Sequence, residues 1–140
     1  MITSPALADA RGLRADSDPA ALATAPLLHL DLGDRGWLAW QDWFAAYGVD
    51  PPAPHRRILF HYYPLVLRQA IAGHGVALGW RALVDDLVTT RLLVVVGPEV
   101  STPRGYHLTW SPGRVRVPAR AIARAVRTLT GHHASSTPVP

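Results

Sequence analysis

One segment of the chain, residues 57–96, constrains the fold more than any other. Two short apolar runs, at 57–60 and 75–79, have the length of buried strands, and a helix that begins at Tyr63 and Pro64 separates them. A short helix with an acidic centre and a third apolar run at 92–96 follow. Strand, helix and strand at this spacing form a βαβ unit, which requires a parallel sheet. The segment therefore predicts an α/β fold.

Capping signals divide the rest of the chain. Ser4 with Pro5, and Asp18 with Pro19, are typical helix starts, and Gly12 and Gly48 are typical helix ends. We expect short helices at 4–12 and 18–24, a strand at 27–30 and a helix capped by Asp34 over residues 35–47. Further along, a strand at 106–110 and a last helix at 118–129 are expected, followed by a disordered tail at 131–140.

Six sequence motifs occur in an informative order. They are TSPALADARG, WQDWFAAYGV, RQAIAGHGVALG, LVDDLVTTRLL, GYHLTW and PARAIARAVRTL. This ordered set, from residue 3 to about 129, resembles the effector-binding (substrate-binding) domain of LysR-type transcriptional regulators. Within that family it looks most like the branch that contains the glycine-cleavage activators.

The resemblance implies a type 2 periplasmic-binding-protein-like fold. Residues 3–100 would form one lobe, a parallel or mixed sheet flanked by helices on both faces, and residues 105–130 the return strand and terminal helix of the other lobe. A full-length member carries a winged helix-turn-helix, a linker helix and most of the first lobe before this point, and we expect this chain to lack them. It would then bind a small-molecule effector, and associate with a second copy or a full-length regulator. By itself it would not recognise a DNA sequence.

Length and composition agree with one partial domain. A chain of 140 residues buries one core. It contains no apolar run of about 18 residues and no signal-peptide pattern, so we expect a cytoplasmic protein without a membrane segment. The absence of cysteine excludes disulfides, thiol catalysis and thiolate metal sites.

Arginine supplies every basic side chain, and the formal net charge is +4. Five arginines follow residue 113 with no acidic residue among them, and Arg120, Arg124 and Arg127 have the spacing of one helix face. This face is either a phosphate-contacting patch or the solvated side of an amphipathic helix. We favour the second interpretation, because no aromatic or glycine-rich reader and no recognition-helix pattern accompanies the arginines.

Tryptophan recurs every third residue at Trp37, Trp40 and Trp43. On one helix these rings form a stripe, which is either a ligand-stacking surface or, as we expect, an anchor that faces the core. Trp80 differs, because it follows the carboxyl end of the strand expected at 75–79.

Ligands of open α/β sheets bind outside the carboxyl ends of the strands, which directs attention to two turns. His61, Tyr62 and Tyr63 lie between the strand at 57–60 and the first turn of the next helix, where free N–H groups and the helix dipole favour an anion. In the family that the chain resembles, this turn helps to hold a small, often carboxylate-bearing effector. We therefore predict an effector site at His61, Tyr62 and Tyr63, with Gly79 and Trp80 across the pocket. The alternative is that Tyr62 or Tyr63 simply covers the end of the sheet.

Catalytic and metal-binding patterns are poorly represented. The seven histidines are scattered, no H-x-x-x-H or H-E-x-x-H motif occurs, and Asp85 and Asp86 are adjacent on a helix, so their carboxylates diverge. We predict no catalytic residue, no metal site and no cofactor. A free-standing solute-binding module of the same fold and a small enzyme of unknown chemistry remain the alternative functions.

Overall fold

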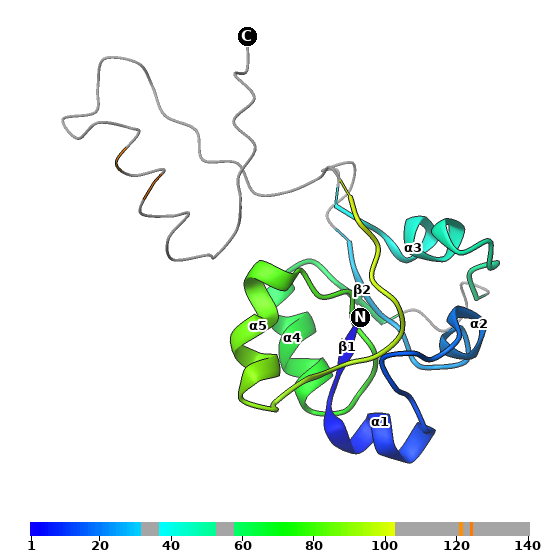
Figure 1. Ribbon diagram of the computed structural model, residues 1–140, viewed down its shortest axis with the longest axis horizontal. Helices are drawn as coiled ribbons and strands as arrows, with labels where there is room; N and C mark the ends of the chain where they lie inside the picture. Colours follow the sequence, from blue (N-terminus) through cyan, green and yellow to red (C-terminus); the bar gives the residue numbers. More distant parts are fainter. Residues whose placement is uncertain (32–36, 53–57, 103–120, 122–123, 125–140) are drawn as a thin grey trace, which may run out of the picture. The chain divides into compact units, whose positions relative to one another are not determined.

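The computed structural model describes residues 1–31, 37–52 and 58–102, together with Ala121 and Arg124. The chain divides into two units, Met1–Arg104 and Gly105–Pro140. The expected strand at 106–110 and tail at 131–140 lie outside the described residues. So does the expected helix at 118–129, apart from Ala121 and Arg124, which are helical. The elements labelled in Figure 1 all belong to the first unit.

Val76 and Ala77 lie in the middle of a mixed sheet. Ala77 bridges β1 (Ile2–Thr3) in the antiparallel sense, and Val76 bridges the residue before β2 (Leu28–Leu30) in the parallel sense. Farther out, β1 pairs antiparallel with β4 (Val94–Val95), and β2 pairs parallel with β3 (Ile58–Phe60). The order is therefore β3, β2, residues 76–77, β1 and β4, with β1 running against the others.

The predicted βαβ unit is present. β3 leads into α4 (Tyr63–Ile71), and the chain then returns to residues 76–77, which run parallel to β2. The crossover passes over β2, so the two strands of the unit are not neighbours. The strand expected at 75–79 pairs only at Val76 and Ala77, because its neighbour β1 ends after two residues, where Ser4 caps the next helix.

Capping residues account for where three of the helices, α1, α2 and α4, begin or end. The Ser4 hydroxyl accepts the N–H of Leu7 at the start of α1 (Pro5–Arg11), and Gly12 ends that helix with φ of 64°. Asp18 caps α2 (Pro19–Leu22) in the same way. Gly73, with φ of 78°, follows α4. α5 (Arg81–Thr89) carries Asp85 and Asp86, which are both exposed. No helix within the described residues is both long and apolar enough to cross a membrane.

The start of the third helix was predicted wrongly. α3 spans Trp40–Ala46, and residues 37–39 are not helical. The carboxylate of Asp42 accepts the N–H of Ala39 at 3.0 Å, which fixes the beginning of the helix there. Asp34, the expected cap, lies outside the described residues. Trp37 is therefore not on the same helix as Trp40 and Trp43.

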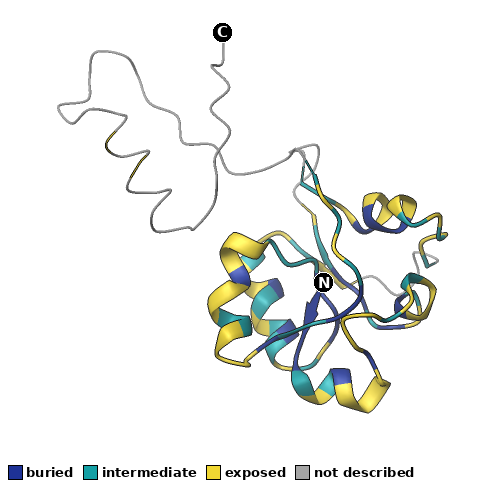
Figure 2. Cartoon of the chain, in the orientation of Figure 1, coloured by how far each residue is buried: buried dark blue, intermediate teal, exposed yellow. Residues whose placement is uncertain are grey.

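Alternate residues of the strands face two separate apolar cores. Leu27 and Val76 join the core that contains Trp40, Trp43 and Phe44. Their neighbours in sequence, Leu28 and Ala77, join the core of α4 and α5. Buried residues accordingly lie along the strands, with exposed helix faces on both sides (Figures 1 and 2). The expected sheet with helices on both faces is confirmed.

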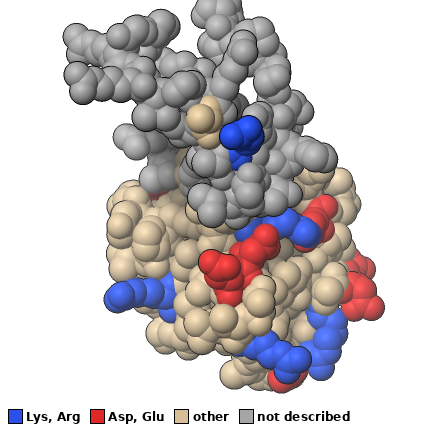
Figure 3. Space-filling model, turned by 60° about the vertical axis from the view of Figure 1, so that its left-hand side comes forward, with Lys and Arg blue, Asp and Glu red and all other residues tan. Residues whose placement is uncertain are grey.

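Charge is unevenly divided along the chain. The described residues from 1 to 102 contain five arginines and nine acidic side chains, although the whole chain has a net charge of +4. On the face shown in Figure 3, acidic and basic side chains are interspersed between uncharged ones. This part of the chain therefore has an acidic balance.

Candidate functional site

The carboxyl ends of β2, β3 and residues 76–77 meet at one edge of the sheet, because these strands are parallel. A cavity of about 270 Å³ lies at this edge, and we call it the edge cavity. Its walls come from the end of β2, the start of α3, the first turn of α4, and Leu78 with Trp80. The lining side chains include Asp31, Trp37, Gln41, Tyr63, Leu78 and Trp80.

Tyr63 joins α4 to the segment that follows the central strand. Its hydroxyl donates to the carbonyl oxygen of Leu78 at 3.3 Å and accepts the N–H of Trp80 at 3.3 Å. The ring is half-buried and forms part of the cavity wall. Both interpretations of Tyr63 therefore describe the same side chain, which covers the end of the sheet and lines the edge cavity.

Trp37 completes an aromatic group around this cavity. Its ring centroid lies 5.8 Å from that of Tyr63 and 5.3 Å from that of Trp80, with an interplanar angle of 83° for the second pair. These are ordinary edge and tilted contacts between aromatic rings. Trp40 and Trp43, by contrast, are 3% and 2% exposed and belong to the core. The expectation of a core-facing stripe is confirmed for these two, although Trp40 also borders the edge cavity, whereas Trp37 is half-buried at that cavity.

Asp31 carries the only formal charge among the described residues that line the edge cavity. It follows β2 directly, and its N–H donates to the carbonyl of Phe60, the last residue of β3. His29 and Gln41 add neutral polar groups. The cavity therefore combines aromatic walls with one carboxylate.

The remaining predicted site residues have different positions. His61 is exposed, and its Nδ1 lies 3.1 Å from the carbonyl oxygen of Asp31 at the mouth of the same sheet edge. Tyr62 is 63% exposed. Neither side chain lines the edge cavity, whereas Tyr63 and Trp80 both do. Gly79 lines a second cavity on the other side of the segment that ends at Trp80.

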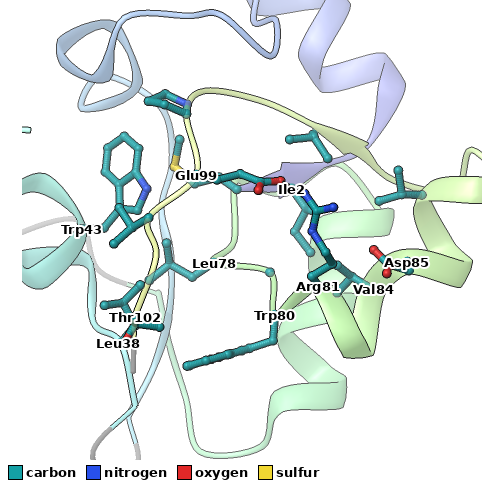
Figure 4. A pocket seen from close by; sticks show the side chains of 16 residues that line it. Ile2, Leu38, Trp43, Leu78, Trp80, Arg81, Val84, Asp85, Glu99 and Thr102 are labelled. Atoms are coloured by element: carbon teal, nitrogen blue, oxygen red, sulfur yellow. Dashed lines mark hydrogen bonds and ion pairs between the residues drawn. The ribbon is translucent and has the colours of Figure 1, made fainter. Parts of the chain in front are cut away.

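This second cavity, of about 280 Å³, lies on the β1 and β4 side of residues 78–80 (Figure 4). Its rim holds an ion pair between Arg81 and Glu99. The hydrogen bond and charge of Glu99 raise the pKa of Arg81 above its ordinary value. Leu38, Leu78 and Trp80 line both cavities, so the two share one wall. We call this space the inner cavity.

Comparison with known families identifies the domain. Residues 1–131 match the family described as the LysR substrate binding domain.

The chain belongs to the LysR substrate-binding domain family. It is similar to the HTH-type transcriptional regulator TrpI of Pseudomonas aeruginosa, with 35% identity over 118 residues. That match covers 84% of this chain but 38% of the relative, so the chain spans less than half of the relative's length.

Two solved structures resemble this LysR substrate-binding domain. One is the AmpR effector-binding domain of Citrobacter freundii, with a TM-score of 0.60 and 23% identity. The other is a Citrobacter freundii effector-binding domain with three substitutions, with a TM-score of 0.58 and 25% identity. Each match covers 93% of this chain, and 62% and 61% of the respective structures. The expected fold, one lobe of a type 2 periplasmic-binding-protein-like domain, is confirmed.

Sequence reasoning did not place Trp37 at the edge cavity. Its spacing of three from Trp40 placed it on the same helix face as the core tryptophans. The available signal was Asp42, which lies three residues after Ala39 and so marks a helix that begins after Trp37. Leu38 and Asp31 were also missed, because apolar and acidic residues in loops have no distinctive pattern.

Proposed function

We propose that this LysR substrate-binding domain is the effector-sensing part of a cytoplasmic transcriptional regulator, and that it binds a small carboxylate or amino-acid-like metabolite. The observation that carries the proposal is the aromatic group of Trp37, Tyr63 and Trp80 at the carboxyl ends of three parallel strands. Concave sites with aromatic walls and few polar groups are typical of small-molecule binding. The motifs in residues 68–93 support a place in the branch of the glycine-cleavage activators.

The charges favour an amino acid over a plain carboxylic acid. The carboxylate of Asp31 attracts an ammonium group. The first turn of α4, with His61 before it, favours the carboxylate of the ligand, because N–H groups and the helix dipole point towards that end. The aromatic walls then contact the apolar part of the ligand.

Association with a second copy of the domain, or with a full-length regulator, is also proposed. Among the described residues β3 pairs only with β2. Its Ile58 and Leu59 are 43% and 51% exposed, and Leu65 on the adjacent α4 is 45% exposed. An apolar strand edge of this kind is a surface for protein association.

We propose that operator DNA is recognised by a part of the regulator other than this domain. Without a recognition helix, arginines give only weak, salt-sensitive binding to any duplex. An electrophoretic shift assay at about 150 mM salt should show equal binding to a duplex and to its scrambled version. A clear preference for one duplex would contradict this assignment.

The effector site is tested by NMR titration of the chain with a panel of amino acids and matched carboxylic acids that lack the amino group. We expect shifts at residues 61–63 and 79–81 and at the Trp37 indole, with amino acids binding more tightly. Dissociation constants near the millimolar range, about −4 kcal/mol, are expected, because the cavity is smaller than most ligand pockets. Shifts centred on Trp43 would contradict the proposed site, and equal affinity for the acids without an amino group would contradict the preference for amino acids.

A further inference from the structure

The inner cavity has the composition of a binding site of its own. Its floor is formed by apolar side chains from three elements, Ile2 of β1, Val84 and Val88 of α5, and Val95 of β4. Trp43 and Trp80 line it from different sides, and Trp80 also lines the edge cavity (Figure 4). A volume of about 280 Å³ accommodates a single ring or a short alkyl chain. Apolar walls of this size favour the apolar body of a small ligand.

The rim determines which charged group such a ligand carries. Arg81 is held by Glu99, and Asp85 lies one turn along α5 from Arg81 (Figure 4). The rim therefore contains two carboxylates and one guanidinium. Met1 also lines the cavity, and burial lowers the pKa of its α-amino group, whereas the charge of Glu99 acts in the opposite direction. Among the side chains of the rim, the surplus of negative charge favours a cation.

A ligand carboxylate is disfavoured at this rim for a second reason. It would share Arg81 with Glu99, and it would lie close to the carboxylates of both Glu99 and Asp85. An ammonium group is attracted by these two carboxylates, and the pair between Arg81 and Glu99 can stay in place. The excess of acidic over basic side chains in residues 1–102 also favours a cationic ligand over an anionic one.

We propose that the inner cavity is a second ligand site, which binds a small amine with one aromatic ring or short alkyl chain. The site is separate from the proposed effector site, and it would exist whether or not the edge cavity binds an amino acid. Because Leu38, Leu78 and Trp80 line both cavities, an amine in the inner cavity contacts the wall of the edge cavity from behind.

Three probes with the same ring and different charge test the proposal: benzylamine, benzyl alcohol and benzoate. Each is titrated into the full chain at about pH 8, where benzylamine is still protonated. Backbone shifts are followed by NMR. We expect benzylamine to shift Val84, Val88 and Glu99, and to bind at least about tenfold more tightly than benzoate. Equal binding of benzylamine and benzoate, or shifts confined to the edge cavity, would overturn the proposal.

Two neighbouring carboxylates provide a matched pair of variants. Asp85 lines the inner cavity, whereas Asp86 is also exposed on the same helix but does not line it. Asp85→Asn should weaken benzylamine about threefold, in keeping with an exposed ionic contact, and Asp86→Asn should leave the affinity unchanged. Equal effects of the two substitutions would mean that benzylamine is attracted by the negative charge of the whole domain and not by a defined site, and this would refute the proposal.

Val88→Phe, which fills the cavity, should abolish the shifts at Val84. Since Asp85 is exposed, its variant remains decisive if Val88→Phe fails to fold.

Discussion

The phenol oxygen of Tyr63 accepts a hydrogen bond from the backbone N–H of Trp80, 3.3 Å away, and the same hydroxyl donates to the carbonyl of Leu78. One side chain at the start of α4 therefore holds the two backbone groups where the central strand leaves the sheet. These groups border both the edge cavity and the inner cavity. The position of the wall between the cavities thus depends on Tyr63.

Removal of this hydroxyl should loosen the wall without removing the ring. Tyr63→Phe is expected to lower the free energy of unfolding by about 1 kcal/mol, the usual net value of a hydrogen bond, and to weaken effector binding. Urea unfolding measures the first effect and NMR titration the second. Tyr62→Phe is the control, because Tyr62 is 63% exposed, and it should change stability by less than about 0.5 kcal/mol. Equal effects of the two substitutions would show that the hydroxyl of Tyr63 has no structural role.

Alanine substitution of Trp37 should reduce ligand affinity, whereas alanine substitution of Trp43 should reduce stability. Trp37→Ala removes a wall of the edge cavity from a half-buried position, so it should reduce amino-acid binding at least about tenfold while the domain stays folded. Trp43 is 2% exposed in the core, and Trp43→Ala should cost about 3–5 kcal/mol. Circular dichroism and NMR titration distinguish the outcomes. Unchanged ligand affinity in folded Trp37→Ala would remove this residue from the site.

Alanine substitution at Gly97 and at Gly48 distinguishes the cost of backbone strain from the cost of fitting a Cβ into a crowded position. Their φ angles are 66° and 65°, so alanine meets the same conformational cost at both positions. A Cβ at Gly97 would lie 2.6 Å from Met1 Cε and closer still to the fully buried Leu22, whereas a Cβ at Gly48 meets nothing within 4 Å. Gly97→Ala should therefore destabilise the domain by about 1–3 kcal/mol more than Gly48→Ala in urea unfolding. A difference below about 0.5 kcal/mol would mean that Leu22 and Met1 move aside freely.

Self-association should depend on the apolar side of β3 and α4. Leu65→Lys places a charge on this surface and should raise the dissociation constant of any dimer at least about tenfold, as measured by sedimentation equilibrium. Leu83→Lys is the matched control, because Leu83 is 41% exposed on a different helix, α5. A larger effect at Leu83 than at Leu65 would place the association surface on α5 instead.

Local signals predicted most of the helices correctly. Ser4, Gly12, Asp18 and Gly73 act on backbone groups within a few residues, so their roles can be read from the sequence. The sheet order was not predictable in the same way. β1 consists of Ile2 and Thr3 alone, and its partners are fixed by packing between distant segments rather than by a local pattern. The start of α3 was missed because a plausible cap at Asp34 competed with the capping contact of Asp42.

The candidate site, like the fold, was predictable only in part. The rule that ligands bind at the carboxyl ends of parallel strands led to Tyr63 and Trp80, which both line the edge cavity. The rule gives the turn but not the direction of each side chain, and Tyr62 lies in that turn with its ring exposed. Trp37 reaches the site from a different segment, through contacts that no spacing within the chain specifies.

The position of β1 has a consequence for synthesis of the protein on the ribosome. Ile2 leaves the ribosome well before its strand partners, Ala77 and Val95, which lie far along the chain. Both edges of β1 therefore stay unpaired until most of the described lobe has been translated, and the apolar side chain of Ile2 has no core to enter. Nascent chains that stall before residue 95 would expose an unpaired strand edge, which is a template for aggregation. The lobe thus folds as a late, nearly complete unit rather than from its first residues onward.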